Sequence, residues 1–383
     1  MKRKVLNICV NGIYTDGYTY HENLLPKYQK INGNDVYILA SQYEFNDKGN
    51  VQKSTRDEYI DENGIYVKRL KIKGDKPYSY RLKRFNDFYK EIERINPDII
   101  FCHLFQFLDS LEVVKYVKKH PEVKLYVDSH ADQFNSAHSF ISLYFLHKGL
   151  WRFCAQRLVR YCTWFYGVLP ARVDFLRDVY RIPEKKSKLL VMGVDDIEAN
   201  RANLEQNQLK TREKYHILKN EFVIVTGGKI TQLKSEVITL MNAMENINAR
   251  LVVFGSVDKD IAEEFNSALQ KSNVTYAGWL SSEESYNLFA ISNLAVFPST
   301  HSVYWEQVTG QGIPMIVKHW NGIEHIDVGG NVIILDDVSE DTIAQSINSV
   351  VNNQKLYFSM KEIALQKGRD LFSYSSIARE SIS

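Results

Sequence analysis

The sequence predicts an α/β protein built from two doubly wound, parallel-sheet domains, and three observations support this fold class. The chain has 383 residues, more than a single hydrophobic core usually accommodates. Short apolar segments alternate with amphipathic ones, as expected when strands buried on both faces are connected by helices. One polar stretch interrupts the alternation, which then begins again. Each half of the chain therefore has the pattern of its own parallel sheet.

The N-terminal half begins with the apolar segment VLNICV, residues 5–10, which runs into Asn11-Gly12. Further apolar segments follow, with helical spacing of the apolar residues between several of them. Strands are expected at residues 5–10, 36–40, 98–103, 124–130 and 165–170, and helices at 20–31, 108–120 and 171–180. These elements predict an N-terminal, Rossmann-like domain over residues 1–192.

The C-terminal half repeats the pattern after a polar stretch, residues 193–215, which we interpret as an interdomain linker. Strands are expected at residues 222–228, 249–255, 274–278, 294–299, 314–318 and 331–335. The second Rossmann-like domain should cover residues 216–365, and residues 366–383 should form a C-terminal helix or tail that packs back on the first domain. Open α/β sheets bind ligands at the carboxyl ends of their strands, so two such domains would face each other across a cleft.

Charge and composition narrow the class of protein. Residues 1–200 contain 32 Lys and Arg against 25 Asp and Glu, whereas the rest of the chain contains 16 against 21. The four cysteines have no metal-binding spacing and fit reduced thiols. No apolar run approaches the ~20 residues that span a bilayer. The first apolar run is too short for the core of a signal peptide. We therefore expect a cytoplasmic protein.

Several common cofactor motifs are absent from the sequence. The glycines after the first strand, Gly12 and Gly17, do not have the Gly-x-Gly-x-x-Gly spacing of a dinucleotide site. Neither a Gly-x4-Gly-Lys-Ser/Thr phosphate loop nor a Gly-x-Ser-x-Gly nucleophile elbow occurs. Nicotinamide, P-loop and serine-hydrolase chemistry are therefore unsupported.

The segment VTGGKITQLK, residues 225–234, follows the first strand of the second domain. Gly227 and Gly228 permit a tight backbone turn. Lys229 and Lys234 follow in the same loop, and two ammonium groups beside a glycine turn suit a diphosphate. The alternative is a pair of solvated surface lysines, because Gly-Gly-Lys alone is a weak motif.

The segment FPSTHSVYWEQVTGQGIP, residues 297–314, is a second junction of strand and helix. A helix that begins near Ser302 would offer free N–H groups to an anion. Glu306 or Gln307, in its first turns, would accept hydrogen bonds from ribose hydroxyls, and the stronger acceptor is the carboxylate of Glu306. A charged residue in a first helical turn is also ordinary, so the pattern alone leaves a structural role open.

A third junction, VDSHADQ, covers residues 127–133. Asp128, His130 and Asp132 alternate like metal ligands, with His103 at another strand end as a candidate partner. No second motif completes such a site. We therefore favour a polar His130 that faces a ligand, or a packed structural histidine, and we expect neither a metal nor a cofactor.

Taken together, these segments resemble the retaining GT-B glycosyltransferases of glycosyltransferase family 4. Residues 163–196, which end in Gly-Val-Asp-Asp, resemble the interdomain stretch of that family. GGKITQLKS resembles its Gly-Arg-x4-Lys phosphate clamp, and residues 251–258 and 274–299 resemble the strands and helix that follow. The order and spacing of the segments are more specific than any one of them, and the resemblance covers most of the chain.

The resemblance implies roles for individual residues. Lys229 stands where the clamp has arginine, Lys234 matches the clamp lysine, and His130 matches a histidine that borders the reacting sugar. The implied catalytic residues are His130, Lys229 and Lys234, and the implied donor-binding residues are Asn11, Gly12, Gly228, His301, Ser302, Glu306, Gln307, Val308 and Thr309. The family carries two glutamates eight positions apart. Counting back from Gly312 puts Gln307 at the second position, and the first glutamate is missing.

The resemblance also implies an activity, the transfer of a sugar from a nucleotide sugar with retention at the anomeric carbon. The donor would be UDP-linked and bound by the domain at 216–365, and the acceptor would be a glycan or lipid-linked glycan, as in surface polysaccharide assembly. The lysines would stabilise the leaving diphosphate without a metal ion. Two alternatives stay open. The missing glutamate suggests a non-catalytic GT-B-like subunit that binds a glycan or a partner, and a nucleotide-sugar epimerase has the same architecture.

Two stretches, residues 68–94 and 139–166, combine basic and aromatic side chains in a way that suits an anionic membrane surface. The aromatic residues of the first stretch are Tyr78, Tyr80, Phe85, Phe88 and Tyr89. Alternatively, the aromatic rings pack inside the first domain and the charges form a solvated face. No nucleic-acid recognition motif accompanies them, so no nucleic-acid partner is expected. The prediction is a cytoplasmic enzyme, peripheral at the inner face of the cell membrane.

Overall fold

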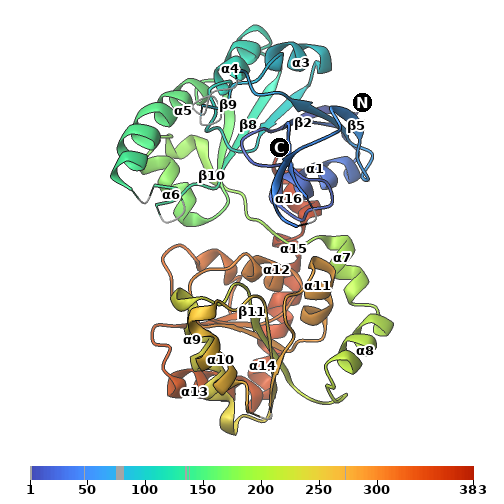
Figure 1. The fold of residues 1–383 in the computed structure, drawn as a ribbon, viewed down its shortest axis with the longest axis vertical. Coiled ribbons are helices and arrows are strands. Elements are labelled where there is room, and N and C mark those ends of the chain that lie inside the picture. Colours follow the sequence, from blue (N-terminus) through green and yellow to red (C-terminus); the bar gives the residue numbers. More distant parts are fainter. Residues whose placement is uncertain (1, 47, 75–81, 134–135, 138, 272) are drawn as a thin grey trace. The chain divides into compact units, whose positions relative to one another are not determined.

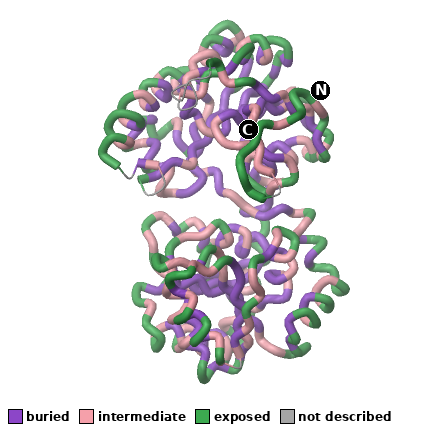
Figure 2. The backbone as a smooth tube through the Cα atoms, viewed as in Figure 1, coloured by how far each residue is buried: buried purple, intermediate pink, exposed green. Residues whose placement is uncertain are grey.

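The computed structural model describes residues 2–46, 48–74, 82–133, 136–137, 139–271 and 273–383. The chain forms two compact units, Met1–Val191 together with Tyr374–Ser383 (unit 1) and Met192–Ser373 (unit 2). Figure 1 shows a sheet with surrounding helices in each unit, and Figure 2 shows that buried residues concentrate inside each of them. The predicted α/β fold of two parallel-sheet domains is confirmed.

The described residues of unit 1 form an eight-stranded sheet in the order β10-β9-β8-β7-β1-β2-β6-β5. Its strands are β1 (Lys4–Cys9), β2 (Asp35–Ser41), β5 (Glu58–Ile60), β6 (Tyr66–Leu70), β7 (Ile99–Cys102), β8 (Lys124–Ser129), β9 (Cys162–Gly167) and β10 (Ser187–Leu189). Neighbouring strands pair in parallel, except that β5 is antiparallel to β6 at one edge. A separate antiparallel hairpin consists of β3 (Tyr43–Phe45) and β4 (Val51–Lys53).

The helices of unit 1 lie between these strands in the chain. They are α1 (His21–Ile31), α3 (Phe88–Ile95), α4 (Ser110–Lys119), the π-helix η1 (Ser142–Trp151), α5 (Arg152–Leu158), α6 (Pro170–Asp178), the short 3-10 turn η2 (Glu184–Lys186) and α16 (Tyr374–Glu380). All residues of β7 are buried, and so are nearly all of β1 and β8. Both faces of the central sheet are therefore covered, which explains the continuous apolar runs in the sequence.

Strand β6 was not expected from the sequence, because Lys68 and Arg69 interrupt its apolar residues. The structure buries Arg69 and satisfies its guanidinium group, which forms an ion pair with Glu44 at 3.2 Å. The same group donates to the carbonyl oxygens of Tyr14 at 3.0 Å and Ser41 at 3.2 Å. A buried charge is tolerated when it is paired and hydrogen-bonded in this way.

The C-terminal helix α16 belongs to unit 1, where it packs against α1. Gln29 in α1 donates from Nε2 to Ser381 Oγ at 3.2 Å, and the hydroxyl of Tyr126 in β8 donates to the carbonyl oxygen of Ser383 at 2.8 Å. The end of the chain is thus held by side chains from two elements of the first unit.

Unit 2 contains a six-stranded parallel sheet in the order β13-β12-β11-β14-β15-β16. Its strands are β11 (Val223–Gly227), β12 (Arg250–Phe254), β13 (Val274–Tyr276), β14 (Leu294–Phe297), β15 (Met315–Lys318) and β16 (Val332–Leu335). The longer helices are α7 (Asp196–Ala202), α8 (Glu205–Lys214), α9 (Glu236–Ala243), α10 (Ala262–Ala268), α11 (Ser282–Ala290), α12 (Tyr304–Gly310), α13 (Glu340–Val351) and α14 (Gln354–Ile363). The shorter helical segments are η3 (Gln232–Lys234), η4 (Met244–Asn246), η5 (Lys259–Ile261), η6 (Glu324–Ile326), η7 (Ala364–Gly368) and α15 (Arg369–Leu371).

Residues 193–215, expected to be a linker, are folded as α7 and α8 within unit 2. The side chain of Asp195 caps α7 by accepting hydrogen bonds from the backbone of Ile197 and Glu198. Lys214 at the end of α8 forms an ion pair with Glu284 in α11 at 2.8 Å. The stretch looked like a linker because α8 is polar almost throughout and has little apolar periodicity.

Candidate functional site

The carboxyl ends of β11 and β14 form a candidate anion site in unit 2. The two strands pair in parallel, with Ile224 opposite Leu294, so the loops that follow them leave the same edge of the sheet. These loops line a narrow cavity of about 10 Å³. Its lining residues are Thr226, Gly227, Lys229, Ile230, Lys234, Val237, Phe297, Pro298, Ser299, Thr300 and Ser302. Lys229 and Lys234 thus share one cavity with Ser302, which is far from them in the sequence.

Two glycines make this arrangement possible. A Cβ atom on Gly227 would lie 2.4 Å from the ring of Phe254, closer than side-chain atoms approach each other. Gly228 has a φ of 123°, a backbone conformation that other residues rarely adopt. A Cβ atom there would point toward Ser302 Oγ at 3.8 Å. The backbone therefore turns tightly at these glycines, and Gly228 lies next to Ser302 of the second loop.

The two lysines of the loop differ in their surroundings. Lys229 has a largely exposed side chain, and its Nζ lies 3.9 Å from Asp258. Lys234 is half-buried, and burial lowers the pKa of its ammonium group, although nearby Glu236 acts in the opposite direction. Within the described part of the chain, Lys234 Nζ makes no hydrogen bond or ion pair. Its charge is therefore available to an anion in the cavity.

The carboxylate of Glu236 does not pair with Lys234, because both of its oxygens have other partners. Its two carboxylate oxygens accept hydrogen bonds from Lys318 Nζ at 2.6 Å and from Ser299 Oγ at 2.9 Å. Burial alone would raise the pKa of Glu236, but these two contacts hold it below its ordinary value. The carboxylate stays ionised and turned toward β15, which leaves Lys234 as the uncommitted cation of the loop.

Glu306 is fully buried and lies at the centre of a second cluster of side chains. Its Oε1 accepts hydrogen bonds from His301 Nε2 at 2.9 Å and from His325 Nε2 at 3.0 Å. Burial alone would raise the pKa of Glu306, but the two imidazole groups outweigh this effect and lower the pKa to about 2. His301 also stacks on the indole ring of Trp320, with 5.9 Å between the ring centroids. The carboxylate therefore holds His301 in place.

Three residues with a predicted donor-binding role have buried side chains, and their contact with a donor stays a prediction. Glu306 has no exposed surface; its Oε1 is turned to the two histidines, whereas its Oε2 makes no hydrogen bond with the described residues. The side chains of Val308 and Thr309 are buried as well, and Thr309 Oγ1 donates to the carbonyl oxygen of Trp305 at 3.0 Å. Helix α12 has only two turns and packs most of its residues inward. Gln307 is the partly exposed residue, with its amide 3.4 Å from Ser285 Oγ.

A much larger cavity, about 760 Å³, lies in unit 1. Its lining residues are Asn11, Leu82, Lys83, Leu104, Gln106, His130, Ala131, Ser136, Ile141, Leu146, His147 and Trp151. The predicted residues Asn11 and His130 are thus brought together in unit 1. Apolar side chains dominate the wall, and Lys83 is the cationic residue among those that line it.

Lys83 is held by the turn that follows β1. Its ammonium group donates to the backbone carbonyl of Asn11 and, over 2.7 Å, to the Asn11 side-chain oxygen. Burial lowers the pKa of Lys83 to about 8. Gly12, also predicted to bind the donor, comes next in the chain, and a Cβ atom on it would lie 3.3 Å from a carboxylate oxygen of Glu22. The Asn11-Gly12 turn therefore positions a cation at the cavity wall.

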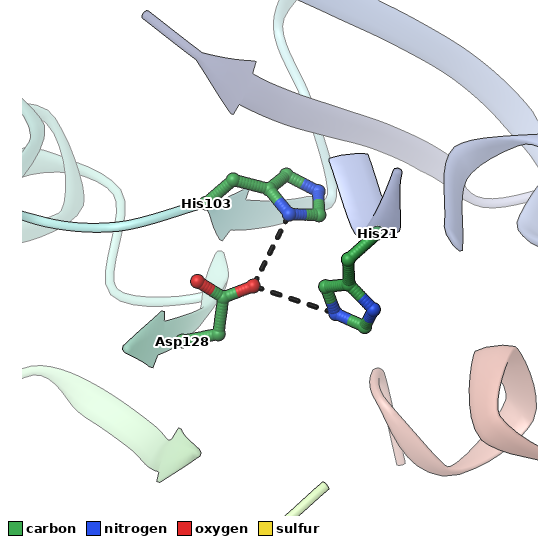
Figure 3. A group of neighbouring side chains, drawn as sticks. All are labelled: His21, His103 and Asp128. Atoms are coloured by element: carbon green, nitrogen blue, oxygen red, sulfur yellow. Dashed lines mark ion pairs between the residues drawn. The ribbon is translucent and has the colours of Figure 1, made fainter. Parts of the chain in front are cut away.

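Asp128, His130 and Asp132, which alternate like metal ligands in the sequence, do not form one cluster, because Asp132 contacts a different partner from the one that Asp128 and His130 share. Asp132 accepts from Arg172 Nε at 3.1 Å. Asp128 Oδ2 lies instead 3.1 Å from His103 Nδ1, 3.5 Å from His21 Nε2 and 3.7 Å from His130 Nε2. Figure 3 shows His21 and His103 turned toward this carboxylate.

The two stretches predicted to contact a membrane have different structures. In residues 68–94, Phe85 and Phe88 are buried in the hydrophobic core of unit 1, and Tyr78 and Tyr80 lie outside the described residues. The prediction that the first stretch contacts a membrane is therefore wrong for Phe85 and Phe88, because rings in the core cannot contact a bilayer. Among the described residues no helix has the length and apolarity needed to cross one.

The second stretch carries an exposed apolar surface. We call Phe140, Ile141, Tyr144, Phe145, Leu146 and Phe153 the 140–153 surface; between 43% and 69% of each residue is accessible. Lys148 lies 4.3 Å from the centroid of the Tyr144 ring, and Arg157 lies 4.9 Å from that of Phe153. Residues 139–166 contain four basic residues and no acidic one. Basic and apolar side chains therefore occur together on the exposed side of η1 and α5.

Sequence reasoning missed several residues of these sites. His325 lies 19 positions after Glu306 in the short η6 turn, where no motif signals it. His21 opens α1 without a recognisable pattern. Lys83 was noted only as one of the basic residues of 68–94. The sequence does not show that Lys83 is buried whereas its neighbour Arg84 is exposed. Only their spatial contacts reveal these three residues.

No protein-family model and no curated protein matches the sequence. Solved structures are similar along its whole length. A glycosyltransferase from Rickettsia africae has a TM-score of 0.66 and 15% identity, over 99% of this chain and 96% of that one. HepE from Anabaena in complex with UDP-glucose has a TM-score of 0.66 and 14% identity, over 99% and 98%. UDP-GlcNAc 2-epimerase from Neisseria meningitidis bound to UDP-GlcNAc has a TM-score of 0.62 and 13% identity, over 99% of both chains.

At identities this low, the similarity is one of fold. It covers nearly the whole of each chain, and this chain forms two units that each contain a parallel sheet. The protein therefore has the GT-B fold, the two-domain architecture of the glycosyltransferases to which it is similar.

Proposed function

We propose that this protein is a retaining glycosyltransferase, which moves a sugar from a UDP-linked donor to a glycan or lipid-linked glycan. The observation that carries the proposal is the half-buried, uncommitted ammonium group of Lys234, beside the Gly228 turn and Ser302. A cation next to a closely approachable backbone suits a diphosphate. The similar structures from Anabaena and Neisseria contain UDP-glucose and UDP-GlcNAc, which supports a UDP-linked donor.

In this proposal unit 2 stabilises the leaving group. The bond between the anomeric carbon and the diphosphate oxygen breaks, and the acceptor oxygen forms its bond on the same face of the sugar. The proton of the acceptor hydroxyl passes to the leaving phosphate. Lys234 and, more weakly, the exposed Lys229 would offset the negative charge that develops there. Two ammonium groups would replace the divalent cation that many phosphate sites use, so donor activation would need no added metal.

Unit 1 would bind the acceptor in its large cavity. The cavity offers an apolar wall that includes Ile141, Leu146 and Trp151, with Lys83 among the residues that line it. An acceptor with an anionic group next to an apolar segment, such as a lipid-linked glycan, fits that combination. His130 lines the same cavity and would lie beside the reacting hydroxyl. We propose Lys83 as the anion-binding group and His130 as the catalytic histidine.

The 140–153 surface supports a membrane location for this reaction. Ile141 and Leu146 belong both to that surface and to the wall of the cavity. A lipid-linked acceptor could therefore enter the cavity from a bilayer on which the surface rests. Exposed aromatic rings and neighbouring Lys and Arg side chains suit the interface of an anionic leaflet. We propose a protein that acts at the cytoplasmic face of the cell membrane.

A catalytically silent, glycan-binding subunit is the second candidate. The observation that favours it is the buried position of Glu306, which leaves Gln307 and no carboxylate at the proposed ribose position. An epimerase is a third candidate, because the Neisseria enzyme has the same fold. The three candidates differ in what they release from a nucleotide sugar.

The test is a donor screen with the full-length chain, with and without a lipid-linked glycan and with and without Mg²⁺. Mass spectrometry should detect UDP and a glycosylated product only when the acceptor is present, at a rate that Mg²⁺ leaves unchanged. NMR of the product should show the anomeric configuration of the donor. Release of UDP and free sugar without acceptor would indicate an epimerase-like reaction. Nucleotide binding without turnover on any acceptor would indicate a silent subunit.

A further inference from the structure

Three buried side chains of unit 1 converge on one point (Figure 3). His21 is the first residue of α1, His103 follows β7, and Asp128 lies in β8. Strands β7 and β8 are paired neighbours in the sheet, so His103 and Asp128 come from adjacent strand ends. The side chains of the three residues are 1%, 4% and 0% exposed. Their ligand atoms all lie within 4.8 Å of one another.

The atoms that point at one another are the ones without hydrogen-bond partners. Within the described residues, His21 Nε2, His103 Nδ1 and Asp128 Oδ2 are buried and make no well-aligned hydrogen bond, although both nitrogens lie within ion-pair distance of that oxygen. Buried polar atoms without a partner are rare, and each one calls for a proton, a water molecule or an ion. Here three such atoms face the same point, so one bound ion could serve as the partner of all three.

The opposite side of each group is held by a second partner. His21 Nδ1 lies 3.0 Å from the hydroxyl of Tyr374, and Asp128 Oδ1 accepts from the backbone N–H of Leu104 at 2.8 Å. His103 Nε2 lies 3.1 Å from Asn7 Oδ1. Outer contacts of this kind fix the orientation and tautomer of metal-binding histidines.

A chain of hydrogen bonds determines the tautomer of His103. The hydroxyl of Ser381 donates to the carbonyl oxygen of Ala378, so its oxygen accepts from Gln29 Nε2. Gln29 Oε1 in turn accepts from Asn7 Nδ2 at 2.8 Å. Asn7 Oδ1 is therefore the acceptor of an N–H from His103 Nε2. In neutral His103 this leaves a lone pair on Nδ1, aimed at a carboxylate oxygen 3.1 Å away.

A lone pair and a carboxylate oxygen repel each other at that distance, so a positive charge must lie between them. A proton on His103 Nδ1 would satisfy that contact, but His21 Nε2 would then reach Asp128 Oδ2 only over 3.5 Å, longer than an ordinary hydrogen bond. A divalent cation would satisfy all three atoms. Zinc bonds to imidazole nitrogen and carboxylate oxygen are about 2.0–2.1 Å long, so ligand atoms in a tetrahedral shell lie roughly 3.3 Å apart. The observed separations from Asp128 Oδ2 are 3.1 and 3.5 Å.

We propose that His21, His103 and Asp128 bind one divalent cation, with zinc the best match to two imidazoles and a carboxylate. A water molecule would complete the shell, because His130 Nε2 lies 3.7 Å from Asp128 Oδ2 and is left to face the cavity. The ion would connect α1 with the ends of β7 and β8, so its role is to position His130 at the cavity. It is distinct from the donor diphosphate, which is bound by unit 2, and the proposal does not depend on the transferase activity.

The test measures metal in the full-length chain, purified without a histidine tag from zinc-supplemented cells. Plasma mass spectrometry should find about one zinc ion per chain. His103→Gln should lower the zinc content at least tenfold, whereas His120→Gln should retain it. His120 is the matched control because it is a histidine of unit 1 that pairs with Glu122 outside the cluster. Loss of zinc from both variants, or from neither, would contradict the assignment.

A second measurement keeps the proposal testable if His103→Gln does not fold. The wild-type chain is stripped with dipicolinate and then titrated with Zn²⁺ or Co²⁺. One equivalent of Zn²⁺ should raise the melting temperature, and one equivalent of Co²⁺ should give the intense visible absorption of a tetrahedral site. If the wild-type chain holds no stoichiometric metal as purified and binds none on titration, the cluster is a buried imidazolium–carboxylate pair, and the proposal is wrong.

Discussion

Glu306 Oε1 accepts a hydrogen bond from His301 Nε2 over 2.9 Å, although Glu306 has no exposed surface. The same oxygen accepts from His325, so one carboxylate holds an imidazole from the loop after β14 and another from η6. The position of His301, which is predicted to bind the donor, therefore depends on a buried carboxylate. This relationship separates residues that support the site from residues that contact a ligand.

Glu306→Gln should destabilise the protein at neutral pH more than in acid. The folded pKa of Glu306 is about 2, and the ordinary value is about 4.3. The ionised carboxylate therefore stabilises the fold above about pH 4.3, and this contribution is lost as the pH falls toward 2. Urea unfolding should show a loss of about 2–3 kcal/mol at pH 7 and a smaller loss at pH 3. Glu324→Gln, at an exposed position of η6, is the control. An equal loss at both pH values would contradict the ion-pair assignment.

Gln307→Ala should weaken donor binding without destabilising the fold. Gln307 is partly exposed and its amide makes only long contacts of 3.4 Å, so it can turn to a ribose hydroxyl. One lost hydrogen bond should raise the Kd for UDP about tenfold, close to 1.4 kcal/mol. Calorimetric titration with UDP measures this effect, and the melting temperature serves as the control. An unchanged Kd would remove Gln307 from the ribose site.

Lys234→Ala should reduce turnover far more than Lys229→Ala. The first ammonium group is half-buried and uncommitted, whereas the second is exposed and near Asp258. Loss of a charged contact in a desolvated site should lower kcat/KM about a hundredfold, near 3 kcal/mol. Initial rates with saturating acceptor measure the effect. Lys219→Ala, an exposed lysine of unit 2, is the control. Near wild-type rates for Lys234→Ala would refute the phosphate-clamp role.

Lys83 should make acceptor binding sensitive to alkaline pH. Its pKa is lowered by burial to about 8, so the ammonium form predominates below that pH and the neutral amine above it. The KM for an anionic acceptor should therefore rise above about pH 8 and stay flat below it. Lys83→Arg keeps its charge and should abolish the rise, whereas Lys90→Arg, at an exposed site, should leave it in place. Identical profiles for Lys83→Arg and wild type would exclude Lys83 as the anion-binding group.

Binding to anionic vesicles should depend on the 140–153 surface. Phe140→Ser with Phe145→Ser should weaken co-sedimentation at least tenfold, because both rings are more than 60% exposed. Lys148→Glu with Arg157→Glu should act similarly at low salt, since each charge contributes about 1 kcal/mol near the surface. Leu218→Ser, an equally exposed residue of unit 2, should change nothing. No binding of the wild type to anionic vesicles at low salt would end the membrane proposal.

Local sequence patterns were sufficient for the fold class. VLNICV became β1, and the apolar run at 222–228 became β11, because a strand that is buried on both faces must be apolar at nearly every position. The Gly227-Gly228 turn and the two lysines after it were also readable, because a tight turn leaves its signature in adjacent residues. Strand β6 was missed because its buried Arg69 relies on Glu44 and on carbonyl groups from other segments.

The composition of the sites was decided by the tertiary structure. The sequence indicated that Glu306 is a strong hydrogen-bond acceptor, but only the fold turns it inward, toward His325 and His301. Likewise, the alternation of Asp128, His130 and Asp132 suggested one cluster, whereas the structure assembles His21, His103 and Asp128. Residues of one loop are linked by their spacing, which the sequence displays directly. Residues of different loops meet only because the strands before them pair in parallel, and that pairing is set by the packing of the whole unit.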